Sequence, residues 1–266
     1  VLPGFALSMG ISLLFISLIL LLPVTGLLVQ TAGMSWEQYW GVITDERVVA
    51  SYKVTLWAAG IASLFNGIAG LLLAWVLVRY EFPGKRLIDA LIDLPFALPT
   101  AVAGITLAAL FAENGWYGQL LAELGIKVAF TPLGIVVAMS FTSLPFVVRT
   151  VQPVLEDLPV EDEEAAISMG ASDLAVFRRI LFPSLWPALM SGVALSFTRS
   201  LGEFGAVIFI AGNMPYVGEI TSLMIFIRLQ EFDYGAASAI ASVVLIASLV
   251  LLLAINLWQA RYLRRL

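Results

Sequence analysis

Residues 54–78 read VTLWAAGIASLFNGIAGLLLAWVLV, a run that contains no charged side chain. A helix that crosses the roughly 30 Å hydrocarbon core of a bilayer needs about 20 mostly apolar residues. Because backbone polar groups in lipid must find partners within the chain, a continuous apolar run favours a helix over the alternating pattern of a barrel strand. The stretch therefore predicts a membrane-spanning helix.

Five further runs of the same kind occur, which together predict an all-α polytopic membrane protein with six transmembrane helices. These runs cover residues 7–29, 87–111, 132–154, 185–211 and 236–257. The run at 87–111 carries Asp89 and Asp93 near its start, so five spans and one re-entrant segment are the alternative. The first run is too long for a signal peptide and has no basic residues before it, which favours a span. We expect one transmembrane domain over residues 1–266.

The composition agrees with this interpretation, since 61% of the residues are hydrophobic and 12% are charged, against about 25% charged in an average soluble domain. The absence of cysteine and histidine excludes thiolate nucleophiles, Ser-His-Asp triads and metal sites built from these residues. The net charge of −5 argues against nucleic-acid binding. We therefore expect a protein that is not an enzyme and that binds no cofactor or metal itself.

The basic residues predict the orientation of the spans, because cytoplasmic loops of membrane proteins are enriched in lysine and arginine. If both termini share one side, that side holds nine of the fourteen basic residues. They are Arg79, Lys85, Arg86, Arg149, Arg178, Arg179, Arg261, Arg264 and Arg265. The other side holds Arg47, Lys53, Lys127 and Arg228. Both termini are therefore expected in the cytoplasm.

A polar loop at residues 155–183 separates the fourth and fifth runs, and six of the nineteen acidic residues lie within its positions 156–164. Pro159 suits the first turn of a helix, and acids after it are stabilised by the helix dipole. Gly170 then provides a C-terminal stop. The pattern predicts a helix that ends near Met169.

A second short helix should follow, because Ser172 can cap the N-terminus of residues 173–181 and Pro183 would end that helix. The loop is thus expected to be a structured helix–glycine–helix. Ala165 and Ala166 lack bulk, so another protein could approach the first helix closely. The alternative is an ordinary solvated loop.

The loop sequence EEAAISMGASDLAVFRRILFP at 163–183 resembles the EAA loop of ABC-importer permeases. That family pattern is EAA, three residues, Gly, nine residues and I-x-L-P. The matching residues are Glu164, Ala165, Ala166, Gly170, Ile180 and Pro183, with Phe182 where the family has Leu. The resemblance implies that the loop docks onto a cytoplasmic ATPase subunit. The implied coupling residues are Glu163, Glu164, Ala165, Ala166, Gly170 and Ala171.

Other segments resemble the T-subunit family of sulfate/thiosulfate permeases, notably GVALSFTRSLGEFGAVIFIAGN at 192–213 and TSLMIFIRLQEFDYGAASAIASV at 221–243. The resemblance implies the type I ABC importer permease (MetI-like) fold in the bacterial inner membrane. It implies a homologous W-type permease as heterodimer partner, two cytoplasmic ATPase copies that carry ATP and Mg, and a periplasmic sulfate/thiosulfate-binding protein. Molybdate/tungstate permeases share the LGEFGA core and remain an alternative. An ion-driven secondary transporter is more remote, because no inverted repeat is visible.

Four polar residues of the fifth span, Ser196, Arg199, Ser200 and Glu203, are spaced to share one helix face. Ionisable groups at membrane depth usually face a bundle interior or a water-filled cavity. Arg199 could offer an oxyanion a transient counter-charge, and the serines could donate hydrogen bonds. The alternative is a buried Arg199–Glu203 pair that positions the span without touching substrate.

The third span contains Pro95 and Pro99, followed by Thr100. Proline removes a helical hydrogen bond and frees carbonyl groups that neighbours must satisfy. These residues are candidates for a kinked gating element in the translocation path. A static kink that serves packing is the alternative.

Overall fold

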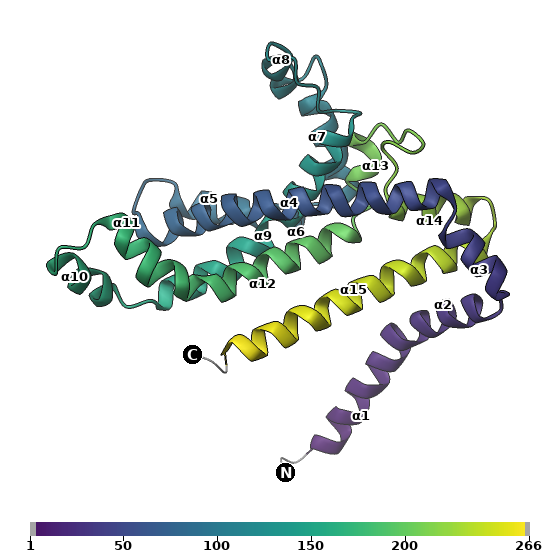
Figure 1. The fold of residues 1–266 in the computed structure, drawn as a ribbon, viewed down its shortest axis with the longest axis horizontal. Helices are drawn as coiled ribbons and strands as arrows, with labels where there is room; N and C mark the ends of the chain where they lie inside the picture. The colour runs from purple at the N-terminus through teal and green to yellow at the C-terminus, as the bar shows by residue number, and fades with distance from the viewer. Residues whose placement is uncertain (1–3, 264–266) are drawn as a thin grey trace.

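The computed structural model describes residues 4–263, and this part of the chain is built from helices alone (Figure 1). In chain order they are α1 (Phe5–Ile16), α2 (Leu22–Ala32), α3 (Trp36–Ile43), α4 (Glu46–Arg79), α5 (Lys85–Ile92), α6 (Leu94–Ala97), α7 (Thr100–Phe111), α8 (Trp116–Ala122), α9 (Pro132–Asp157), α10 (Val160–Ser168), α11 (Asp173–Val176), α12 (Phe182–Leu201), α13 (Val207–Ile210), α14 (Thr221–Gln230) and α15 (Tyr234–Leu263). Two π-helical turns, η1 (Ser17–Leu21) and η2 (Phe177–Leu181), join α1 to α2 and α11 to α12. The predicted all-α class is confirmed.

Within the described residues, five helical segments are long and apolar enough to cross a membrane, judged by length and composition. They are Leu7–Ala32, Glu46–Arg79, Pro132–Asp157, Asp173–Leu201 and Tyr234–Ile255. Each overlaps one of the predicted spans. The remaining predicted span is present in an interrupted form.

The predicted span at 87–111 is divided into α5, α6 and α7. Pro95 sits in the first turn of α6, where its missing N–H removes no helical hydrogen bond. Leu98 is extended, with φ −84° and ψ 135°, because a residue before proline is disfavoured in the helical region. Pro99 is the N-cap of α7, and the chain changes direction there (Figure 1). The sequence predicted a kink at these prolines, and the structure has a full break between two helices there.

The predicted span at 185–211 also differs from the observed helix. The helix begins earlier, at Asp173, and ends at Leu201, before an irregular segment leads into α13. Pro183 does not end the second loop helix as expected. The π turn η2 ends at Leu181, two positions before Pro183, and its wider i→i+5 spacing accommodates the proline ring and its missing donor within a continuous helix.

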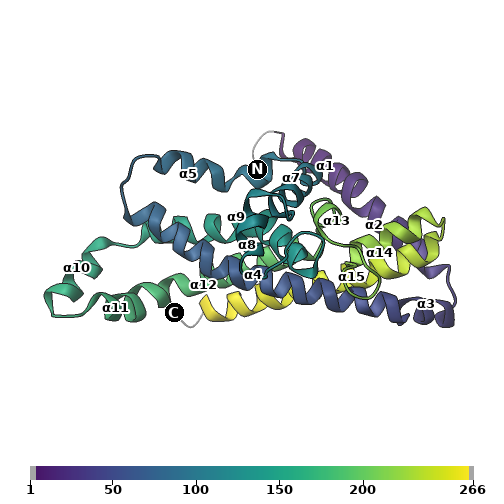
Figure 2. The same cartoon turned by 90° about the horizontal axis from the view of Figure 1, so that it is seen from above.

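The core consists of α4, α9 and α12, which pack side by side (Figures 1 and 2). Glycines allow the close approach: a side-chain carbon added at Gly70 would lie 2.8 Å from Val147 Cβ. One added at Gly192 would lie 2.9 Å from the Cα of the same valine. Small residues at such contacts are typical of helix packing in membranes.

The loop helices α10 and α11 gather at one end of this bundle, together with the start of α5, whereas α3 and α14 lie at the opposite end (Figure 1). The first apolar segment, Leu7–Ala32, lies apart from the core (Figure 1). None of the residues in its most apolar stretch is buried against the rest of the chain. The C-terminal part of α15 points toward the α10 end. Arg264 and Arg265, which contributed to the predicted orientation, lie outside the described residues.

Candidate coupling and translocation sites

The loop between α9 and α12 is a helix–glycine–helix, as predicted. Helix α10 ends at Ser168, and Gly170 adopts a left-handed conformation with φ +86°. Ser172 caps α11, since its side-chain oxygen accepts a hydrogen bond from the Ala175 N–H at 3.4 Å. The turn between the two helices is therefore defined by backbone conformation and a local cap.

The loop presents a mixed polar and apolar surface to solvent. Glu164, Ala165 and Gly170 are exposed, whereas Ala166 is buried against Val176. The same loop also exposes large apolar side chains, which its motif and spacing did not predict. They are Val160, Ile167, Met169 and Leu174, of which Met169 is 83% exposed. Exposed apolar groups of this size are characteristic of protein contact surfaces.

Glu163 does not belong to this exposed surface. Its carboxylate forms an ion pair with the Arg79 guanidinium at the end of α4, and both side chains are mostly buried. Arg79 also lies 6.0 Å from the ring centroid of Trp75, which packs edge-on against Phe177 of η2. Glu163 therefore fastens α10 to the bundle.

The interruptions after α6 and after α12 lie against each other. A side-chain carbon added at Gly205 would stand 2.1 Å from Thr100 Oγ1, and one added at Gly104 would stand 2.4 Å from the Ala206 carbonyl oxygen. The contact therefore requires glycine on both sides. It brings Thr100, a candidate path residue, close to the segment that carries Glu203.

Arg199 and Glu203 form the expected ion pair, with 2.7 Å between Arg199 Nη1 and Glu203 Oε2. Glu203 lies beyond the end of α12, and not on the helix face that the spacing predicted. Its side chain is 1% exposed, whereas that of Arg199 is 34% exposed. The other carboxylate oxygen accepts a hydrogen bond from the Ala206 N–H at 3.0 Å. The carboxylate is thus held inside while the guanidinium reaches toward the surface.

Ser196 and Ser200 are fully buried and turn toward α9. Both hydrogen-bond to Ser143 Oγ, at 2.9 and 3.1 Å. The Asn66 amide nitrogen donates to Ser143 Oγ, Ser196 Oγ and the Ser140 carbonyl oxygen. In this conformation the two serines connect helices, and of the four predicted residues Arg199 is the one that reaches outward. The signal in the sequence that could have revealed this cluster is Asn66, the one asparagine in the apolar run at 54–78.

Replacing Asn66 with alanine is expected to destabilise the three-helix core. The buried serine hydroxyls would lose a shared donor, which costs about 1–3 kcal/mol and lowers the melting temperature of a chain of this size by several degrees. The measurement is thermal unfolding of the purified membrane complex. Ser63→Ala is the matched control, because buried Ser63 donates only to a carbonyl of its own helix. Equal melting temperatures for both variants would contradict the assigned role of Asn66.

Discontinuous helices that meet within an apolar helical bundle are typical of membrane transport proteins. Residues 66–266 match the family model of the binding-protein-dependent transport system inner membrane component. The chain belongs to this family.

Curated relatives match over nearly their whole length. The chain is 68% identical to the sulfate transport system permease protein CysT of Salmonella typhimurium, over 100% of this chain and 96% of the relative. It is 67% identical to the Escherichia coli protein of the same name, with the same coverage, and 48% identical to that of Synechocystis over 95% of this chain and 89% of the relative. These relatives are named as permeases of a transport system, as expected for a chain that is not an enzyme.

Solved structures show the same fold at low identity. A chain of the bacterial alginate ABC transporter in complex with its periplasmic protein aligns with a TM-score of 0.79 and 19% identity, over 97% of this chain and 95% of that chain. A chain of the MetNI methionine ABC transporter aligns with a TM-score of 0.60 and 18% identity, over 87% and 99%. The predicted importer permease fold is confirmed.

Proposed function

We propose that this chain is a membrane-spanning permease subunit of an ATP-driven importer of sulfate and thiosulfate, located in the bacterial inner membrane with both termini in the cytoplasm. The observation that carries the proposal is the exposed helix–glycine–helix loop at the end of the bundle. It occurs in a chain whose relatives, aligned over nearly their whole length, are named as sulfate permeases. The chain would form half of a translocation pathway. A homologous W-type permease would form the other half.

The energy source would be a pair of cytoplasmic ATPase subunits that bind ATP and Mg. They would dock on the surface formed by Glu164, Ala165 and Met169, which the loop exposes. Three less exposed residues would support this surface by fixing α10 and the turn at Gly170. They are Glu163, Ala166 and Ala171. A periplasmic sulfate/thiosulfate-binding protein would deliver the substrate at the α3 and α14 end.

The pathway would run past the touching helix interruptions. Arg199 is suited to give a doubly charged anion a transient counter-charge, because its guanidinium is partly exposed while Glu203 limits how tightly it can hold an anion. Pro95, Pro99 and Thr100 would shape the opposite wall. Ser196 and Ser200 would contribute only if the packing of α9 against α12 changes.

Uptake of radiolabelled sulfate into proteoliposomes that contain the assembled complex tests the proposal. We expect uptake that requires ATP and the binding protein and that unlabelled sulfate and thiosulfate inhibit. Stronger inhibition by molybdate than by sulfate would favour a molybdate/tungstate permease. Uptake that follows a proton or sodium gradient without ATP would favour a secondary transporter.

A further inference from the structure

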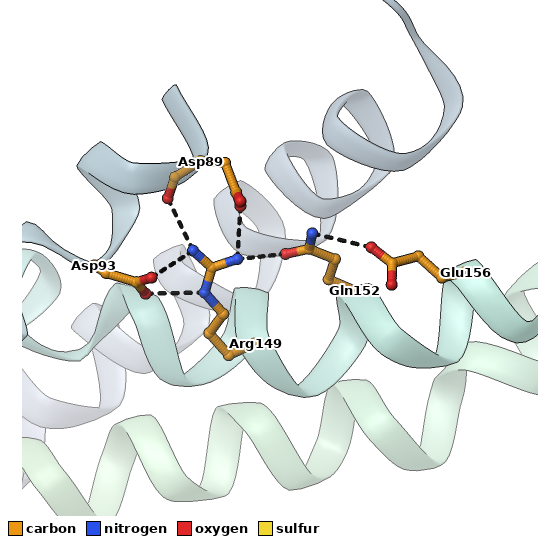
Figure 3. Close-up of polar contacts among 5 residues, drawn as sticks. All are labelled: Asp89, Asp93, Arg149, Gln152 and Glu156. Atoms are coloured by element: carbon orange, nitrogen blue, oxygen red, sulfur yellow. Dashed lines mark hydrogen bonds and ion pairs between the residues drawn. The ribbon is translucent and has the colours of Figure 1, made fainter. Parts of the chain in front are cut away.

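Arg149 of α9 holds the segment before the first helix interruption. All five of its N–H groups are used (Figure 3). Nε and Nη2 donate to the two carboxylate oxygens of Asp93 at 2.9 and 2.7 Å. Nη1 donates to Asp89 Oδ1 and Gln152 Oε1, and Nη2 also reaches the Asp89 carbonyl oxygen. A planar guanidinium fork makes such a set of contacts, and a lysine ammonium with three donors does not.

The same segment has few apolar attachments to the bundle. Ile92 is the buried residue of α5, and Phe96 of α6 meets Phe146 edge-on, at a centroid distance of 5.2 Å. Leu91 is exposed. The polar network around Arg149 is therefore a major part of what fixes α5 and α6 against α9.

The segment is not part of a continuous helix at either end. Gly84 precedes α5 with φ +88°, and a side-chain carbon added there would meet nothing within 4 Å. Leu98 and Pro99 form the extended break at the other end. A cavity of about 670 Å³ lies beside α5, lined by charged side chains that include Glu81, Lys85 and Glu156. Water can therefore reach the network, and the segment has space to move when its polar attachment is lost.

We propose that Arg149 is a positioning residue for transport: it fastens α5 and α6 to α9 and so sets the position of Pro99 and Thr100 relative to the Arg199–Glu203 pair. The inference rests on the proposed function, because its consequence is measured as transport. Arg149 acts through Asp89 and Asp93 and not by contact with substrate.

The absence of cysteine from the chain allows a direct test in the purified complex. Cysteine would be introduced at Ile92, which is 7% exposed on α5, and separately at Ala74, which is 0% exposed on α4 in the same apolar cluster. In the Arg149→Lys background we expect maleimide labelling at position 92 to rise about tenfold, the factor for a loss of roughly 1.4 kcal/mol. Labelling at position 74 should stay unchanged. Arg47→Lys is the matched background. Two nitrogens of Arg47 donate to the carboxylate of Glu219, so this substitution also removes a bidentate ion pair but should not affect position 92.

Sulfate uptake by the assembled Arg149→Lys complex should fall in parallel, by roughly the same factor. Unchanged labelling at position 92, equal increases at both positions, or normal uptake despite increased labelling would each overturn the proposal. If Arg149→Lys does not assemble, Asp93→Asn is evaluated by the same outcomes. A wild-type complex that moves no sulfate would refute the proposed function, whereas the labelling contrast would still decide the role of Arg149 in fastening α5.

Discussion

Gly170→Val should strongly impair sulfate uptake, because the proposed coupling of the loop to an ATPase depends on the turn at Gly170. Gly170 has φ +86°, and a side chain added there would meet nothing within 4 Å. The penalty is therefore conformational: a β-branched residue is strongly disfavoured in the left-handed region, at a cost of about 1–3 kcal/mol. The turn would rearrange, and α10 would lose its orientation. We expect radiolabelled sulfate uptake to fall by a factor between about 5 and about 150, the range that this energy implies.

The control is Gly170→Asn, because asparagine tolerates left-handed backbone far better than valine. It adds a side chain of similar volume to the same exposed surface while keeping the turn. We expect the asparagine variant to retain most uptake and to co-purify with the ATPase. Equal loss of uptake in both variants would show that the surface at Gly170 excludes any side chain, and that backbone conformation is not the reason.

Arg199→Met should impair assembly and sulfate uptake more strongly than the position of Arg199 at the end of α12 suggests. Glu203 is 1% exposed and would be left as a buried charge without its partner, which costs about 3–5 kcal/mol. We expect poor assembly of the complex, measured as the yield of intact complex after detergent extraction, together with loss of sulfate uptake.

The double variant Arg199→Met/Glu203→Gln separates the two roles of Arg199. It removes the unpaired charge, and glutamine can still accept the hydrogen bond from the Ala206 N–H. We expect assembly to recover while uptake stays low, because the counter-charge for the anion is absent. Recovery of uptake to the wild-type rate would refute a substrate role and leave Arg199 as a structural residue.

The sequence was sufficient for the helical class and most of the spans, because runs such as residues 54–78 leave no other arrangement of backbone hydrogen bonds in lipid. The helix–glycine–helix loop was also predictable, since Gly170 and Ser172 act through local backbone conformation and capping. Pro183 misled the prediction because proline marks a helix end only when the surrounding helix cannot widen into a π turn.

The tertiary role of polar residues could not be predicted from spacing. Ser196 and Arg199 share the same helix and a periodic pattern, yet one is buried against α9 and the other reaches outward. Arg149 contributed only one positive charge to the predicted orientation. Its partners Asp89 and Asp93 lie about sixty positions earlier in the chain, 60 and 56 residues away. That pairing is a tertiary contact between α9 and the α5 segment, which spacing along the chain does not reveal.

The π turn η2 has a consequence for the geometry between the two candidate sites. A π turn carries one residue more than the α-helical path, and one residue corresponds to about 100° of rotation around a helix axis. Deleting one residue from 177–181 would make Asp173–Leu201 a regular helix and would also turn the α10–α11 loop by that angle relative to Arg199. A single extra residue therefore sets how far the loop is rotated about the helix axis relative to the Arg199–Glu203 ion pair.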